Sequence, residues 1–294
     1  MVNVDEAYAA CARLARTHYE NFPVASALVP KRMRPHIAAI YAFARTADDF
    51  ADEGTRPPQE RLRLLDDWLA RLHACVAPGF APAGSDHDAL FVALGRTMLD
   101  CALPLPLFED LLSAFRQDVM TTRYETWADL LDYCRRSANP VGRLVLRVAG
   151  HSDNDLDRAS DALCSALQLT NFWQDFARDW THGRLYVPLA DMRGAGARED
   201  DLAARRLTPE WRAALAEMAR RTRALFDEGR PVCNGVAGRL RYELRATWLG
   251  GRHVLDAIER SQFDVFTGRP ALRALDMPAI AWGAIAWRRT IASA

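Results

Sequence analysis

The fold of this chain is decided by a stretch that reads Ala39-Ile40-Tyr41-Ala42-Phe43-Ala44-Arg45-Thr46-Ala47-Asp48-Asp49-Phe50-Ala51-Asp52-Glu53. It contains no proline or glycine, and most of its residues favour an α-helix. Asp48 and Asp52 are four residues apart, so on a helix they lie about one turn apart on the same face. Carboxylates at that spacing repel each other, which favours a cation between them, and a divalent ion is the first candidate. A solvated helix end is the alternative, because charged helix faces are common.

A second copy of the pattern lies far along the chain, in the stretch Gln168-Leu169-Thr170-Asn171-Phe172-Trp173-Gln174-Asp175-Phe176-Ala177-Arg178-Asp179. Asp175 and Asp179 repeat the spacing after an apolar helical run, and Gln168 and Asn171 share their face. Polar side chains inside a core-like helix need partners, so this stripe lines a metal-loaded cavity or pairs with another element. Two such helices facing each other would place four carboxylates around one cleft. Oxygen ligands of this kind suit magnesium.

The two stretches resemble the paired aspartate-rich motifs of the squalene and phytoene synthase family, the head-to-head isoprenoid synthases. The resemblance extends from about His18 to the end of the chain. It includes Arg123-Tyr124, Tyr133-Cys134 and Gly183-Arg184-Leu185-Tyr186-Val187-Pro188. Four segments are similar to the bacterial hydroxysqualene synthase branch of hopanoid biosynthesis: Asn21–Ser26, Arg45–Asp49, Ser137–Gly142 and Asn171–Asp175.

The resemblance implies an all-α isoprenoid synthase fold, with helices around a central apolar cavity and two facing aspartate-rich motifs. It also implies the site and its cofactor, roughly two or three magnesium ions and no NADPH. The implied metal ligands are Asp48, Asp52, Asn171, Asp175 and Asp179. The implied catalytic residues are the four aspartates with Tyr41 and Arg45, and the implied substrate-binding residues are His18, Arg45, Asp49, Tyr133 and Gln168.

Arg45 has two interpretations. Its planar guanidinium suits a direct phosphate contact by fork geometry. An ion pair with Asp48 or Asp49 on the helix surface is the alternative, and the spacing of three and four residues allows either acid.

The branch implies that presqualene diphosphate is ionised with magnesium, and that water captures the rearranged cation to give hydroxysqualene. The chain departs from the wider family at Gln174, Arg178, Asn139-Pro140 and Gly251. Asn139 and Gln174 are polar, which suggests that they position the attacking water. Two alternatives stay open: a presqualene diphosphate or phytoene synthase that condenses two prenyl diphosphates, and a non-catalytic helical partner subunit of such an enzyme.

Bulk properties bound these interpretations. The chain has 294 residues without a linker long enough to divide it, which predicts a single domain over residues 1–294. Lysine plus arginine balance aspartate plus glutamate at 38 each, so a nucleic acid partner is not expected. Six scattered cysteines are typical of buried side chains in a reducing cytosol. We expect a cytoplasmic enzyme with a prenyl-type diphosphate substrate. A presqualene diphosphate synthase, a downstream enzyme and peripheral contact at the inner face of the cytoplasmic membrane are the partners to consider.

Periodicity predicts an almost wholly helical chain, with examples at Arg61–Val76 and Leu207–Phe226 and breaks where proline and glycine cluster. Thr208 is expected to cap a helix that has Pro209 at its first position. The apolar segment Met277–Trp287 is too short to span a membrane. We expect it to be a core helix, and contact with a bilayer surface is the alternative.

Overall fold

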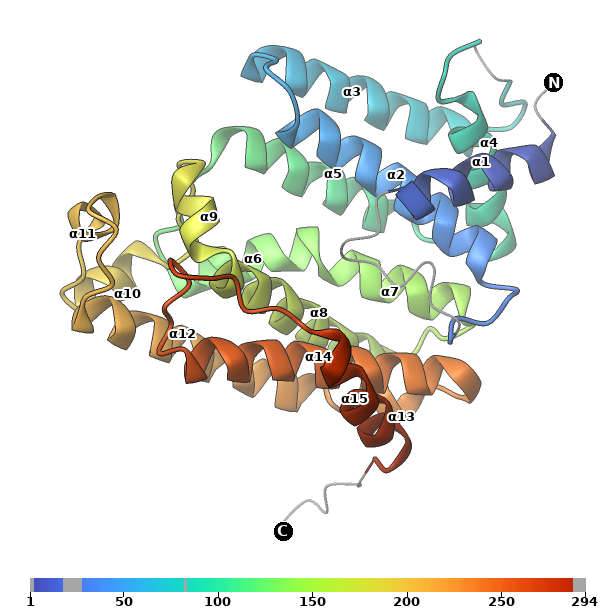
Figure 1. Cartoon of the computed structure of the whole chain (residues 1–294). Helices are drawn as coiled ribbons and strands as arrows, with labels where there is room; N and C mark the ends of the chain where they lie inside the picture. Colours follow the sequence, from blue (N-terminus) through green and yellow to red (C-terminus); the bar gives the residue numbers. More distant parts are fainter. Residues whose placement is uncertain (1–2, 18–27, 82–83, 288–294) are drawn as a thin grey trace. The chain divides into compact units, whose positions relative to one another are not determined.

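The structure is a computed structural model that describes residues 3–17, 28–81 and 84–287. The chain divides into two compact units. Unit 1 comprises Met1–Thr121 and Arg135–Asp157, and unit 2 comprises Thr122–Cys134 and Arg158–Ala294. The predicted all-α class is confirmed, because the described residues form helices and no β-strand (Figure 1).

In unit 1, helix α2 is packed on several sides by its neighbours α1, α3, α4, α5 and α7. Its aromatic residue Phe43 is fully buried, stacks on Trp68 at 5.9 Å between ring centroids and meets Phe108 edge-on at 5.5 Å. Packing of buried rings around Phe43, together with its five neighbouring helices, makes α2 the centre of this unit. The helices of unit 1 are α1 (Val4–Thr17), α2 (Arg34–Asp52), α3 (Pro58–Cys75), α4 (Asp88–Asp100), α5 (Leu105–Met120) and α7 (Asn139–Val148).

The ends of α2 follow from its local sequence. Proline in the first turn suits a helix start, because its fixed φ is helical and its missing N–H has no partner there. At the other end Glu53 turns to an extended conformation, and Gly54 follows with a φ of +75°. The helix therefore stops directly after its acidic residues, as the sequence predicts.

Unit 2 is built on the long helices α8, α12 and α14. Gly229 brings α12 close to α8, since a Cβ there would lie only 2.6 Å from the backbone nitrogen of Leu163. The helices of this part are α6 (Trp127–Ser137), α8 (Asn154–Gln174), α9 (Phe176–Thr181), α10 (Leu189–Gly194), α11 (Glu199–Ala203), α12 (Pro209–Gly229), α13 (Val232–Gly235), α14 (Gly238–Arg260), the 3₁₀ turn η2 (Ala274–Asp276) and α15 (Met277–Ile285). Helices α6 and α8 also contribute residues to unit 1.

The helices predicted at Arg61–Val76 and Leu207–Phe226 are present with shifted ends, as α3 and α12, and the predicted cap of α12 is confirmed. The Thr208 hydroxyl accepts a hydrogen bond from the Trp211 N–H at 3.4 Å, with Pro209 in the first turn. The short helix α11 was not predicted, because it lies in a glycine-rich stretch and is too short to show a period.

One prediction for unit 2 is wrong. The segment that includes α15 is not a core helix, since Trp282 is 70% exposed and Ile285 is 64% exposed. The segment is short, and within the described part of the chain its main packing partner is α14. No helix in the described part of the chain is long and apolar enough to cross a membrane. The single domain over residues 1–294 stays a prediction.

Candidate functional site

The first acidic motif lies at the carboxyl end of α2, in unit 1. The Nη2 atom of Arg45 lies 2.7 Å from Asp49 Oδ1 and 2.6 Å from Glu53 Oε1, and its Nη1 atom lies 3.5 Å from Asp48 Oδ2. Burial disfavours the charged guanidinium, but the neighbouring carboxylates, Asp49 first, outweigh it and raise the pKa of Arg45 above its usual value. The ion-pair alternative for Arg45 is thus present in the structure, on a side chain that is still partly exposed.

The end of α2 suits a further cation for a second reason. The carboxyl end of a helix carries a partial negative charge, so Asp48, Asp49 and Asp52 stand where acids are unfavourable. Arg61 of α3 already binds this end, donating to the carbonyls of Ala51 and Gly54. A metal ion bound by the carboxylates would relieve the remaining repulsion.

The second acidic motif lies at a break between α8 and α9, in unit 2. Helix α8 ends at Gln174, and Asp175 occupies the junction with a φ of −97° and a ψ of 9°. The hydrogen-bond pattern nevertheless continues through the break, because the Asp175 N–H donates to the Asn171 carbonyl and the Asp179 N–H to the Asp175 carbonyl, both at 2.8 Å. Asp175 and Asp179 therefore remain one turn apart, as the spacing predicts.

Asp175 is buried and held by an arginine that the sequence analysis did not single out. Arg269 Nε donates to Asp175 Oδ1 at 2.5 Å and Arg269 Nη2 donates to Oδ2 at 2.9 Å, a two-pronged contact. The neighbouring Gln174 accepts from Arg269 Nη2 at 3.2 Å and donates to the carbonyl of Pro270. The loop that carries Arg269 is thus fastened to the second motif.

Asp179 is a carboxyl whose charge is unfavourable in this setting. Burial and, secondly, the charge of Asp175 raise its pKa to about 7, and the cations of Arg184, Arg178 and His182 offset only part of that effect. A divalent cation between Asp175 and Asp179 would stabilise the ionised form. The residues of the second motif therefore fit a metal ion.

The ligands of such an ion are not gathered at one point within either unit. Among the residues that the structure describes, no three histidine, cysteine, aspartate or glutamate side chains converge as a metal site would require. Each unit instead contributes one pair of acids at the spacing of one helical turn. The prediction that the two motifs face each other stays a prediction.

Comparison with known proteins decides the family. Residues 15–276 match the squalene/phytoene synthase family. This chain belongs to that family. The hydroxysqualene synthase of Rhodopseudomonas palustris is 40% identical over 222 residues, which cover 75% of this chain and 73% of that protein. The hydroxysqualene synthase of Zymomonas mobilis is 40% identical over 210 residues, 70% of this chain and 67% of that protein.

Solved structures of the squalene/phytoene synthase family agree with the fold. The crystal structure of squalene synthase HpnC from Alicyclobacillus acidocaldarius has a TM-score of 0.82 and 43% identity, and covers 88% of this chain and 95% of that one. A dehydrosqualene synthase structure has a TM-score of 0.84 at 22% identity and covers 97% of both chains, which supports the fold alone.

Two segments that carry the family resemblance meet beside the second motif. The Leu185 N–H donates to the Thr122 carbonyl at 3.0 Å, and Arg123 Nη1 donates to the Gly183 carbonyl at 2.6 Å. Arg123-Tyr124 and Gly183–Pro188 are therefore neighbours in unit 2. The strap after α9 is also tied to the motif itself, because the Arg184 N–H donates to the Asp179 carbonyl at 2.9 Å.

Tyr133 belongs to a group of buried aromatic rings in unit 2. Its ring lies 5.6 Å from that of Tyr124 and 6.1 Å from that of Phe172, and Phe172 stacks on Tyr186 at 3.6 Å. These rings pack on one another, and Phe172 and Tyr186 each cover one face of the other. Trp173 is different: it is fully buried and its indole N–H bonds to the Thr222 hydroxyl at 2.9 Å, which makes it a core residue.

The remaining site residues predicted for this family member divide between the two units. Tyr41 lies one turn before Arg45 on α2 and is partly buried against the core of unit 1. Gln168 and Asn171 are partly exposed on α8, in the turns before Asp175. His18 lies outside the described residues.

At Gly251, where the chain departs from the wider family, the structure shows why a glycine is present. A Cβ at this position would lie 2.5 Å from Leu167 Cδ2 and 2.8 Å from Phe226 Cζ. These two side chains fill the space that a larger residue on α14 would occupy. Close packing of α14 on its neighbours therefore requires a glycine at position 251.

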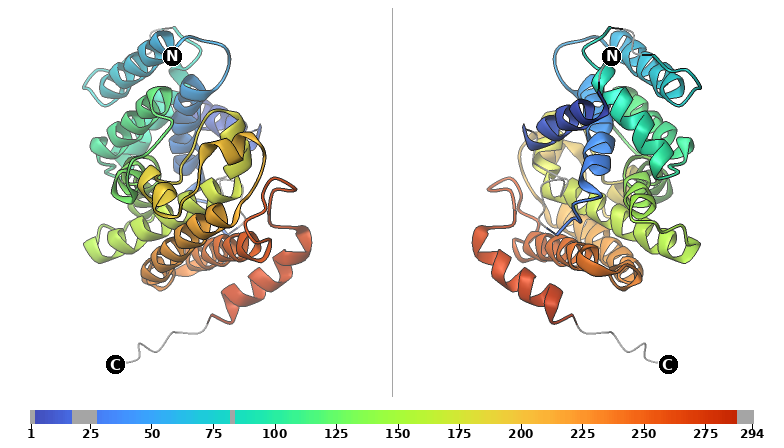
Figure 2. Two further views of the ribbon diagram at one scale, coloured as in Figure 1. Left: turned by 90° about the vertical axis from the view of Figure 1, so that its left-hand side faces the viewer. Right: turned by 90° about the vertical axis from the view of Figure 1, so that its right-hand side faces the viewer.

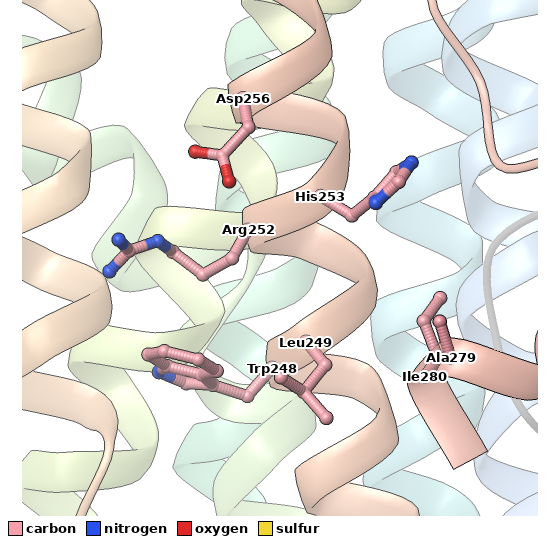
Figure 3. A pocket seen from close by; sticks show the side chains of 7 residues that line it. All are labelled: Trp248, Leu249, Arg252, His253, Asp256, Ala279 and Ile280. Carbon is pink, nitrogen blue, oxygen red and sulfur yellow. The ribbon is translucent and has the colours of Figure 1, made fainter. Parts of the chain in front are cut away.

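A groove of about 290 Å³ between α14 and α15 contains none of the predicted site residues (Figure 3). Its charged side chains already have partners: Arg252 pairs with Asp227 at 2.8 Å, and Asp256 pairs with Arg223 at 2.7 Å. Its lining residues are Trp248, Leu249, Arg252, His253, Asp256, Ala279 and Ile280. We therefore seek the chemistry at the acidic motifs rather than in this groove.

Proposed function

We propose that this protein is a magnesium-dependent hydroxysqualene synthase that converts presqualene diphosphate and water to hydroxysqualene and diphosphate, in squalene and hopanoid biosynthesis. Its family acts on prenyl diphosphates with divalent metal ions. The observation that carries the proposal is a pair of acids with an arginine beside it in each unit, in a chain 40% identical to proteins named hydroxysqualene synthase.

The proposed metal ligands are the two acid pairs together with the Asn171 amide. When bound, magnesium neutralises the charge that develops on the diphosphate leaving group as the C–O bond breaks. Roughly two or three ions suit a diphosphate, because magnesium shares its coordination sphere with phosphate oxygens. The ligands are Asp48, Asp52, Asn171, Asp175 and Asp179.

Arg45 is proposed to bind the diphosphate directly. Its guanidinium is held beside the acids by Asp49 and Glu53, so it is already oriented before substrate arrives. A positioned arginine loses less conformational freedom on binding phosphate than a free one. Asp49 would thus act by holding Arg45, and His18, Tyr133 and Gln168 complete the proposed substrate contacts, with Tyr41 at the reacting end.

Arg269 adds a step to this proposal. It engages both oxygens of Asp175 with one hydrogen bond each, so a metal ion either shares these oxygens with Arg269 or displaces it from one of them. Because Gln174 is bonded to the same loop, we expect the loop to adjust when Arg269 is released. The guanidinium is then available beside a bound anionic group.

Water capture distinguishes this reaction from those of other family members. The reaction consumes one water, releases diphosphate and needs no reductant, so no NADPH is expected. The proposed water-positioning residues are Asn139, which is buried at the start of α7, and Gln174. Unchanged water capture in Asn139→Ala and Gln174→Ala would exclude them.

The decisive experiment incubates the purified protein with magnesium and no NADPH, separately with presqualene diphosphate and with farnesyl diphosphate, followed by mass spectrometry of the products. Hydroxysqualene from presqualene diphosphate alone supports the proposal. Asp48→Ala and Asp175→Ala should abolish turnover while the protein still folds. Loss of an acid relieves repulsion within each pair, and in Asp175→Ala this offsets the lost ion pair with Arg269.

The second candidate is a synthase that condenses two prenyl diphosphates. It is favoured by the 15-cis-phytoene synthase of Synechococcus elongatus, which is 30% identical over 281 residues, 92% of this chain and 89% of that protein. Presqualene diphosphate formed from farnesyl diphosphate, or phytoene formed from geranylgeranyl diphosphate, would establish this activity. Absence of product from every substrate would favour the non-catalytic partner subunit.

The place of the enzyme in the cell is also a proposal. A presqualene diphosphate synthase must supply its substrate, and a downstream enzyme must use hydroxysqualene. Because both lipids are poorly soluble in water, we propose a cytoplasmic protein that works near these enzymes at the inner face of the cytoplasmic membrane.

A further inference from the structure

Helix α15 has an unusual composition for a surface helix. Its nine residues read Met-Pro-Ala-Ile-Ala-Trp-Gly-Ala-Ile, and none carries a polar group other than the indole of Trp282. One face packs on α14: Ala284 is buried, and Gly283 is so close that a Cβ would lie 3.0 Å from Leu249 Cδ1. A helix that is apolar on all sides is normally buried on all sides.

The other face of α15 and the turn before it are exposed. Leu275 is 89% exposed, Trp282 70% and Ile285 64%, and Leu272 and Met277 are exposed to a smaller degree. We call these five residues the apolar tail face. Helix α15 packs on α14 and crosses it at a steep angle, near the C-terminal end of the described chain (Figure 2). Large apolar side chains gathered in this way mark a surface that binds something.

Arginines of unit 2 gather at the carboxyl end of α15. Arg245 Nη1 donates to the Ala284 carbonyl at 3.1 Å, and the guanidinium groups of Arg230 and Arg245 lie 4.5 and 5.4 Å from the ring centre of Trp287. Burial, and after it the charge of Arg241, lowers the pKa of Arg245. In the described part of the chain neither Arg241 nor Arg245 forms an ion pair with an acid. The guanidinium groups of Arg230 and Arg245 therefore lie beside the carboxyl end of α15.

We infer that the apolar tail face and the arginines beside it bind the surface of an anionic lipid bilayer. Helix α15 lies in the plane of the interface, with Trp282 and Ile285 among the acyl chains. Tryptophan favours that boundary, and the arginines bind lipid phosphates. A second copy of this chain is a poorer occupant, because a two-fold contact would bring the two arginine clusters toward each other.

In the proposed reaction, membrane binding by this surface would help the product to leave the enzyme. Hydroxysqualene has about thirty carbons and one hydroxyl group, so it leaves the enzyme far more readily into a bilayer than into water. This argument rests on the proposed function. The binding itself does not, because it follows from the exposed side chains and their charge.

The test is cosedimentation of the full chain, without substrate, with vesicles of phosphatidylcholine alone or mixed with phosphatidylglycerol. We expect the protein to bind the anionic vesicles, and the double variant Trp282→Ser/Ile285→Ser to bind at least tenfold more weakly. Arg241→Gln should weaken binding to anionic vesicles and reduce its dependence on salt. Leu99→Ser is the matched control, since Leu99 is 71% exposed on α4 of unit 1, and it should bind as the parent does.

Melting temperatures of Trp282→Ser/Ile285→Ser and Leu99→Ser should equal that of the parent, because these side chains are exposed. Arg241 also donates to the Val236 carbonyl, so the melting temperature of Arg241→Gln is measured to check that the variant is folded. No binding to vesicles, or equal binding by the parent and the double variant, would overturn the proposal. So would a dimer in solution that the double variant converts to a monomer, since that assigns the face to a second copy. Turnover of presqualene diphosphate in detergent is measured separately and should be unchanged in the double variant, so failure of the proposed function is distinguishable from failure of membrane binding.

Discussion

Asp175 has two partners to satisfy, Arg269 in this structure and a metal ion in the proposed reaction. Its carboxylate is buried and accepts two hydrogen bonds from Arg269, yet we propose that it also binds a metal ion. A buried carboxylate cannot be left without a cation, because its desolvation is costly. Arg269 therefore serves the metal-free protein by neutralising Asp175 until a metal ion replaces it.

Removal of Arg269 should show that the buried Asp175 carboxylate needs a cation beside it. Arg269→Ala should lower the free energy of unfolding of the metal-free protein by about 1–3 kcal/mol, because it leaves a buried charge unpaired. Magnesium with inorganic diphosphate should restore part of the loss. The control is Arg198→Ala, which breaks a largely exposed pair with Asp200 and should cost less than about 0.5 kcal/mol. Equal effects of the two substitutions in urea denaturation would contradict the role given to Arg269.

The pKa of Asp179 predicts a dependence on pH. Its carboxyl has a pKa of about 7 in the folded protein and 3.8 as its ordinary value, so the folded state holds a proton that the unfolded state loses. Stability of the metal-free protein should therefore fall as pH rises from about 4 to 7. Stabilisation by magnesium should grow over the upper part of that range, because the metal binds the ionised form.

Thermal melting at pH 5.5 and pH 8, with and without magnesium and diphosphate, measures both effects. Asp179→Asn cannot ionise and should lose the dependence on pH in this range. Stabilisation by magnesium that is the same at both pH values in the parent would rule out Asp179 as a metal ligand.

At the scale of single elements, close contact between helices limits which substitutions the chain tolerates. Helix α12 approaches α8 through Gly229, whose Cβ position lies 2.6 Å from a backbone atom of Leu163. Backbone atoms cannot rotate away as a side chain does, so the helices would have to separate to admit a methyl group. The indole of Trp173 on α8 bonds to Thr222 on α12, so this movement would also strain a buried hydrogen bond.

We expect Gly229→Ala to lower the free energy of unfolding by about 1–3 kcal/mol, as overpacking does elsewhere. Gly194→Ala is the control, because Gly194 ends helix α10 with nothing within 4 Å of its Cβ position. That substitution should be neutral or slightly stabilising. Chemical denaturation of both variants measures the difference, and a neutral Gly229→Ala would mean that α12 shifts at little cost.

For the whole molecule, the question is whether two compact units unfold together. Helices α6 and α8 each contain residues of both units, and the boundaries fall inside them, near Cys134 and Asp157. A helix melts cooperatively, so a helix shared in this way couples the stability of its two parts.

We therefore predict a single unfolding transition in calorimetry of the full chain, with equal calorimetric and van't Hoff enthalpies. Two resolved transitions would contradict the single domain predicted from the sequence. Magnesium with diphosphate should raise the midpoint of that one transition, since a ligand stabilises whatever unfolds with its site.

Local sequence was sufficient for the helices and for the acidic motifs. The position of α2, its end after the acids, the cap at Thr208 and the spacing of Asp175 and Asp179 all depend on residues within a few positions of one another. Helix periodicity and capping act over that range, so they are readable from sequence. The prediction that the α15 segment is a core helix was wrong. Its composition shows that the segment is apolar, but composition does not show whether other elements cover it.

The fold class and the family followed from the sequence, which also supplied the residues that we propose as ligands of magnesium and diphosphate. Tertiary structure alone decided that Arg269, 94 residues after Asp175, neutralises that acid, that Leu167 and Phe226 fill the space beside Gly251, and that one face of α15 is exposed. The physical reason is the separation along the sequence of the residues that interact. Hydrogen bonds along a helix join near neighbours, whereas burial and ion pairing depend on which distant segments the packed core brings together.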